Sequence, residues 1–144
     1  MNWDQLEIRL SVAADYLSVR HGLQEFKTRF ANGKSRDIDV NPIELVLAEI
    51  LNNIAEHGDH ASLPEKICLK WALHNNRFSA EISDAGVAYS PLEKIRAARN
   101  TKIHHLTTCL KGGGGGGHII SALCSDIHYR RHGNINILKL QIPV

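Results

Sequence analysis

Alternation of apolar and polar side chains marks several segments of this chain as strands with one buried face. The alternation is clear near the start, where Leu6, Ile8, Leu10 and Val12 share one side. The predicted strands span residues 5–12, 67–73, 78–82, 127–131 and 135–142. The turn His74-Asn75-Asn76 predicts an antiparallel hairpin between the second and third strands. The last two strands are joined at His132-Gly133-Asn134.

Apolar positions elsewhere recur every three or four residues, which is the period of an amphipathic helix. This pattern predicts a helix over 13–30 and a second over 42–57, with Asn41 as its N-cap and Pro42 in its first turn. A third helix carries Ile119, Ile120, Leu123 and Cys124 on one side, and a short helix is predicted at 92–99.

The order of these elements is one strand, two helices, two strands, a long loop, a helix and two strands. Such an order predicts an α+β fold, a two-layer sandwich of a mixed, mostly antiparallel sheet with its helices on one face. The length of 144 residues fits a single domain over 1–144.

The composition and charge of the chain argue against a nucleic-acid-binding, membrane or secreted protein. The net charge of +2, without a basic run, is too small to indicate a nucleic-acid or membrane-surface partner. The N-terminus has no secretory signal pattern, and no apolar run approaches the roughly 18 residues of a membrane span. We therefore expect a cytoplasmic protein with no direct nucleic-acid or membrane partner.

The helix predicted over 42–57 has polar groups beside its apolar face. Glu49, Asn53 and His57 follow one another at intervals of four residues. In one interpretation they simply begin the solvated face, and His57 caps the helix end with Gly58 behind it. In the other, the Asn53 carboxamide is a neutral oxygen ligand for Mg²⁺, and the Glu49 carboxylate takes a proton from an attacking hydroxyl or water.

Asp84 and Gly86 follow the strand predicted over 78–82. The pair is compatible with an ordinary Asx-type turn. It is also compatible with a carboxylate at the mouth of a pocket that accepts a hydrogen bond from an exocyclic amine.

The six glycines at 112–117 again allow two interpretations, a flexible spacer or a phosphate loop. A dinucleotide-binding motif is excluded because no secure strand precedes the run, and a P-loop is excluded because Lys111 lies before the glycines. The run leads directly into an amphipathic helix, whose free N–H groups can hold an anion. This position favours the phosphate loop.

Three segments in order resemble the ATP-binding fold shared by gyrase, sensor histidine kinases and mismatch-repair ATPases, the GHKL superfamily. Within it the chain is similar to the stand-alone anti-sigma-factor serine kinases. The three boxes are Glu49-x-x-x-Asn53-x-x-x-His57-Gly58, then Asp84-x-Gly86 with Tyr89-x-Pro91, and then Gly114-Gly115-x-Gly117 followed by Asp126 and Tyr129. The chain departs from the family at three positions. Ala88 stands where the family has a second glycine, and Gly116 and His118 stand where bulkier or apolar residues are common.

The resemblance implies a role for each matching position. Glu49 would be the catalytic base and Asn53 would bind the Mg²⁺ that bridges the ATP phosphates. Asp84 would receive the adenine amino group, and Gly86 would allow its close approach. Gly114, Gly115 and Gly117 would hold the phosphates beneath an ATP lid at about 88–113.

The resemblance also implies a function. The protein would be an ATP-dependent serine-protein kinase and anti-sigma-type switch that phosphorylates a STAS-type antagonist. It would bind a sigma factor or similar regulator and form a homodimer. The alternative is an ATP- or ADP-binding adaptor that sequesters a regulator without phosphoryl transfer.

Overall fold

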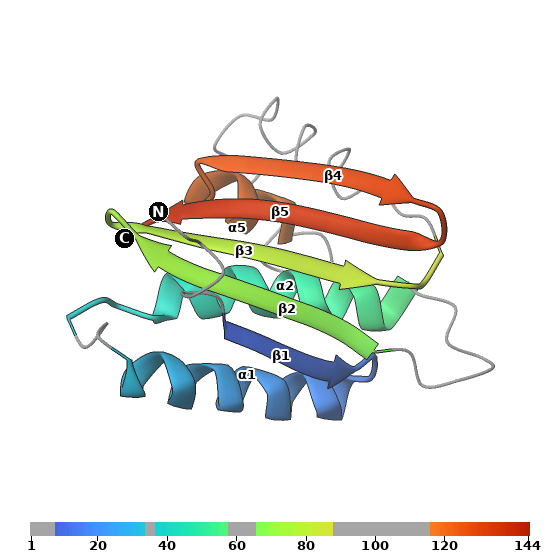
Figure 1. Ribbon diagram of the computed structural model, residues 1–144, viewed down its shortest axis with the longest axis horizontal. Helices are drawn as coiled ribbons and strands as arrows, with labels where there is room; N and C mark the ends of the chain where they lie inside the picture. Colours follow the sequence, from blue (N-terminus) through green and yellow to red (C-terminus); the bar gives the residue numbers. More distant parts are fainter. Residues whose placement is uncertain (1–7, 34–36, 58–65, 88–115) are drawn as a thin grey trace.

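The computed structural model describes residues 8–33, 37–57, 66–87 and 116–144, with the backbone only at 57 and within 116–118 (Figure 1). The elements are β1 (Ile8–Ala13), α1 (Tyr16–Asn32), α2 (Asn41–His57), β2 (Lys66–His74), β3 (Arg77–Asp84), α5 (Gly116–Leu123), β4 (Asp126–His132) and β5 (Ile135–Pro143). The short helix predicted at 92–99 lies outside the described residues.

The five strands form one sheet in the order β1-β2-β3-β5-β4. Every neighbouring pair in it is antiparallel, so the described sheet is antiparallel throughout rather than mixed. Asn75 and Asn76 form the predicted turn between β2 and β3, with φ of 49° and 58°. Two successive left-handed residues suit a tight hairpin, and asparagine tolerates that conformation better than most residues.

The helices α1, α2 and α5 cover one face of the sheet, as predicted (Figure 1). The strand residues that face them are almost all apolar, for example Leu69, Ile82 and Leu138, which lie opposite one another on β2, β3 and β5. They join the helices in one hydrophobic core. The outer face carries polar side chains such as Lys70, Glu81 and Lys139. The architecture is therefore the expected two-layer α+β sandwich.

The start of α1 differs from the prediction. Ala13 belongs to β1, and the helix begins at Tyr16 because the Asp15 side chain accepts a hydrogen bond of 2.8 Å from the Ser18 backbone N–H. Tyr16 and Leu17 share the helical spacing of the buried Leu23, Phe26 and Phe30, but both are exposed. No helix among the described residues is long and apolar enough to cross a membrane.

Close packing of α1 on β1 predicts that Gly22→Ala destabilises the protein. A Cβ at Gly22 would lie 2.5 Å from Val12 Cγ2, which is too close without movement. Alanine favours helix by about 1 kcal/mol over glycine, whereas overpacking a core costs about 1–3 kcal/mol. We expect a net loss in the free energy of unfolding, measured by urea denaturation. The double variant with Val12→Ala should lose less than the sum of the single variants, and strict additivity would contradict the contact.

Candidate functional site

The predicted polar stripe of α2 lies at the border of the core. Six apolar residues of the helix are at most 2% exposed: Ile43, Val46, Leu47, Ile50, Leu51 and Ile54. Glu49 and Asn53, one turn apart, are both half-buried. This position is compatible with side chains that border a shared site. The side chain of His57 lies outside the described residues.

Asp84 ends β3 on the side that faces the helices. It follows Phe78, Ala80 and Ile82 in the buried phase of the strand and is only 4% exposed. Its Oδ2 accepts a hydrogen bond of 3.0 Å from the Gly86 backbone N–H. The Asx-type turn, one of the two interpretations of the sequence, is therefore present, and the carboxylate that forms it is buried.

Asn136 lies directly opposite Asp84, at the start of β5, and is 1% exposed. Its Nδ2 donates to Asp84 Oδ2 at 3.2 Å, to the Val87 carbonyl at 3.0 Å and to the Gly86 carbonyl at 3.4 Å. One carboxamide thus holds both the Asp84 side chain and the backbone that follows it.

The carbonyl end of Asn136 is held from β4. Its Oδ1 accepts hydrogen bonds from Tyr129 Oη at 2.6 Å and from Arg131 Nη1 at 2.8 Å. Arg131 Nη1 also donates to the Gly86 carbonyl at 3.0 Å. Three strands therefore contribute polar side chains to one end of the inner sheet face.

The glycine run leads into a helix, as predicted, because α5 begins at Gly116. Gly117 lies in the first turn of α5, whereas Gly114 and Gly115 lie outside the described residues. Ile120 is buried, and α5 packs against α2, the helix that carries Glu49 and Asn53. The first turn of α5 therefore belongs to the same layer as the polar stripe.

Comparison with known proteins gives the family. The profile of the histidine kinase-like ATPase domain matches residues 10–142. The chain belongs to this family. It is thereby a GHKL-superfamily ATPase, whose domain binds ATP, usually with Mg²⁺.

One solved structure agrees with this family at the level of the fold. The catalytic domain of histidine kinase ThkA, in a nucleotide-free form, is 16% identical with a TM-score of 0.50, over 94% of this chain and 97% of that one. A second nucleotide-free form has 15% identity and a TM-score of 0.47, over 94% and 95% of the two chains. No curated protein matches significantly.

The side chains of this ATPase domain fit Mg²⁺ and a nucleotide. Mg²⁺ keeps several waters and takes few protein ligands, and the neutral hard oxygen of the Asn53 carboxamide suits it. No larger group of potential metal-binding side chains occurs in the part of the chain that the structure describes. The buried Asp84 carboxylate suits the amino group of adenine. The lid predicted at 88–113 and Ala88 lie outside the described residues.

Sequence reasoning missed Asn136 and Arg131. The available signal was that Asn136 stands in phase with the buried Leu138, Leu140 and Ile142, where an unpaired polar group would be costly. Tyr129, noted for its spacing, joins the network. Asp126 does not, since it lies on the outer face and pairs with His128 at 2.8 Å.

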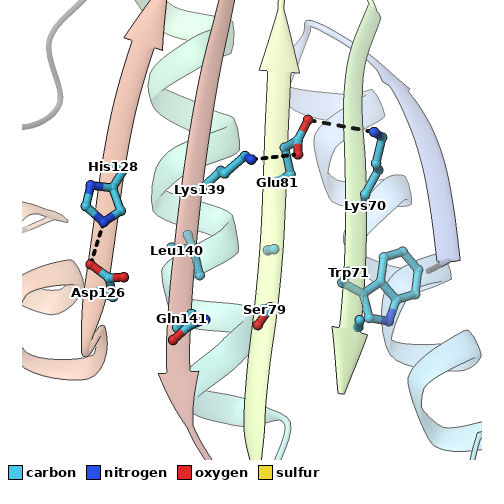
Figure 2. A pocket seen from close by; sticks show the side chains of 11 residues that line it. Lys70, Trp71, Ser79, Glu81, Asp126, His128, Lys139, Leu140 and Gln141 are labelled. Carbon is cyan, nitrogen blue, oxygen red and sulfur yellow. Dashed lines mark ion pairs between the residues drawn. The ribbon is translucent and has the colours of Figure 1, made fainter. Parts of the chain in front are cut away.

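The outer face of the sheet has a cavity, whose lining side chains are drawn in Figure 2. It has a volume of about 220 Å³ and is lined by residues that include Ser79, Glu81 and Gln141. Glu81 lies between Lys70 and Lys139, at 3.7 and 3.8 Å. Asp84 and the helices lie on the opposite face, so the cavity is not the nucleotide site.

Proposed function

We propose that this ATPase domain is a serine-protein kinase that uses Mg-ATP and acts as an anti-sigma-type switch. Its substrate is a serine of a STAS-type antagonist protein. The observation that carries the proposal is Glu49, a half-buried carboxylate one helical turn from Asn53 at the border of the core. The order of the three sequence boxes supports the same assignment.

Phosphoryl transfer needs a base, a position for the nucleotide and compensation of charge. The serine hydroxyl oxygen forms a bond to the γ-phosphorus, the bond from that phosphorus to the β,γ-bridging oxygen breaks, and ADP leaves. Glu49 accepts the proton of the serine hydroxyl. Asp84 accepts the adenine amino group and so fixes the nucleotide.

The remaining residues would bind Mg²⁺ and the phosphates of ATP and compensate the phosphate charge. Asn53 would hold Mg²⁺, which when bound compensates the phosphate charge. The backbone N–H groups of Gly114, Gly115 and Gly117 would hold the phosphates, helped at Gly117 by the first turn of α5. Gly86, which has no side chain, allows the adenine ring to approach the backbone closely.

The proposed partners follow from the same resemblance. The protein binds a sigma factor or similar regulator and acts as a homodimer. Phosphorylation adds a charge of about −1.5 to −2 to the antagonist serine, which changes the electrostatics of any surface that the antagonist binds.

The proposal is tested by incubating the protein with Mg-ATP labelled in its γ-phosphate and with a STAS-domain antagonist from the same organism. We expect label on one serine of the antagonist, and none when that serine is alanine. ATP binding without transfer would contradict the kinase. That outcome would favour the alternative, an ATP- or ADP-binding adaptor.

A further inference from the structure

We infer that Arg131 and Asn136 form a positioning relay that holds Asp84 as the hydrogen-bond acceptor for the base of the nucleotide. The three residues lie directly opposite one another across three strands. Arg131 of β4 is the register partner of Asn136 on β5, and Asn136 is the register partner of Asp84 on β3. All three side chains meet on the helix-facing side of the sheet, so the relay runs straight across the strands to the candidate site.

Arg131 decides which way the Asn136 carboxamide faces. A guanidinium group only donates hydrogen bonds, so the Asn136 atom 2.8 Å from Arg131 Nη1 must be the carbonyl oxygen. The amide nitrogen then points to the other side, where Asp84 Oδ2 lies at 3.2 Å. Arg131 thereby acts on Asp84 through Asn136.

The amide nitrogen of Asn136 fixes the orientation of the Asp84 carboxylate. Oδ2 accepts from Asn136 Nδ2 and from the Gly86 backbone N–H, and two N–H donors on this oxygen favour a carboxylate that accepts hydrogen bonds. The same Nδ2 donates to the Val87 carbonyl at 3.0 Å, which ties down the chain just after the turn. The orientation of Asp84 thus depends on this amide together with the Gly86 backbone N–H.

Charge compensation gives the relay a second role. Asp84 is 4% exposed, and a buried carboxylate is costly unless it is hydrogen-bonded and its charge is balanced. The Arg131 residue is exposed, but its Nη1 donates a hydrogen bond to Asn136 Oδ1. The neutral Asn136 therefore connects a buried negative charge with a positive charge at the solvent edge.

This inference rests on the nucleotide site of the proposed function, and it leads to a prediction about base selectivity. ATP offers an amino group to an acceptor, whereas inosine triphosphate has a carbonyl at that place. A site that holds Asp84 as an acceptor rejects the carbonyl, because two acceptors then face each other. Loss of the relay should weaken ATP binding and leave the binding of inosine triphosphate nearly unchanged.

The experiment measures the Kd of both nucleotides, with Mg²⁺, for the full chain and three variants. Asn136→Asp keeps the acceptor for Tyr129 and Arg131 but removes the donor to Asp84. Arg131→Gln removes the donor-only group that orients the amide. Arg130→Gln is the matched control, since Arg130 is the exposed neighbour on the outer side of β4 and loses the same charge.

We expect the ATP Kd to rise about 10- to 100-fold in Asn136→Asp and about 3- to 10-fold in Arg131→Gln, the range for unsatisfied buried hydrogen-bonding groups. The Kd for inosine triphosphate should change less than about 3-fold, and Arg130→Gln should behave as wild type. A merely structural role would weaken both nucleotides equally.

An unchanged ratio of the two Kd values in both variants would overturn the relay. If Asn136→Asp does not fold, Arg131→Gln decides, because its side chain lies at the solvent edge. A wild-type chain that binds no ATP would overturn the nucleotide site and the relay together. A chain that binds ATP with the expected selectivity but transfers no phosphate would overturn the kinase and support the relay.

Discussion

Glu49→Gln should lower the rate of phosphoryl transfer by about 10²- to 10⁴-fold, the usual contribution of a general base. Glutamine has the size of glutamate and can still donate and accept hydrogen bonds, but it cannot take the proton of the serine hydroxyl. We expect the ATP Kd to change little, because Asp84 and the glycines hold the nucleotide. The measurement is the single-turnover rate of phosphoserine formation on the antagonist, with the ATP Kd of the same preparation.

Glu44→Gln is the matched control for this variant. Glu44 lies in the first turn of the same helix and pairs with Lys27 of α1 at 3.1 Å, so it belongs to another side of α2. The change in charge is identical, and a surface ion pair contributes only about 0–1 kcal/mol. Transfer at the wild-type rate in Glu49→Gln would remove Glu49 as the base. An equal loss in both variants would point to a general effect of charge.

The sheet was predictable because one of its faces is buried and the other is not. Such a sheet forces period-two alternation on its strands, which is why Leu69, Ile82 and Leu138 stand out in the sequence. The beginning of α1 was less predictable. Tyr16 and Leu17 have helical spacing but are exposed, and the true signal was Asp15 three residues before Ser18. A cap depends on one hydrogen bond and leaves no periodic pattern.

The candidate site was predictable where its chemistry is local. Glu49 and Asn53 share one helix, and Asp84 with Gly86 forms one turn, so spacing alone relates them. Asn136 was missed because the asparagine-rich connection around Gly133 has the composition of a turn. Its hydrogen bond to Asp84 spans 52 residues of sequence. Such long-range pairs become visible only when the strand register is known.

Phe26→Ala should cost about 3–5 kcal/mol in the free energy of unfolding, the range for removing a buried aromatic side chain. Phe26 of α1 is fully buried, with its ring edge-on to Trp71 at 4.9 Å and to Phe78 at 5.9 Å between ring centroids. It therefore joins the helix layer to β2 and β3. A domain of ordinary stability has only about 5–15 kcal/mol in total. The loss is measured by urea denaturation, provided that the m-value, the dependence of the free energy of unfolding on urea concentration, is the same in both proteins.

Leu17→Ala is the control for Phe26→Ala, since Leu17 belongs to the same helix and is 63% exposed. We expect its effect within about 0.5 kcal/mol, as for most surface substitutions. Below the urea transition, where Phe26→Ala is still folded, its ATP Kd should equal that of wild type, because the ring packs on Phe78, near the end of β3 opposite Asp84. A loss of stability near that of Leu17→Ala would contradict the aromatic cluster as the link between α1 and the sheet. A weakened ATP Kd in the folded variant would show that α1 packing reaches the nucleotide site.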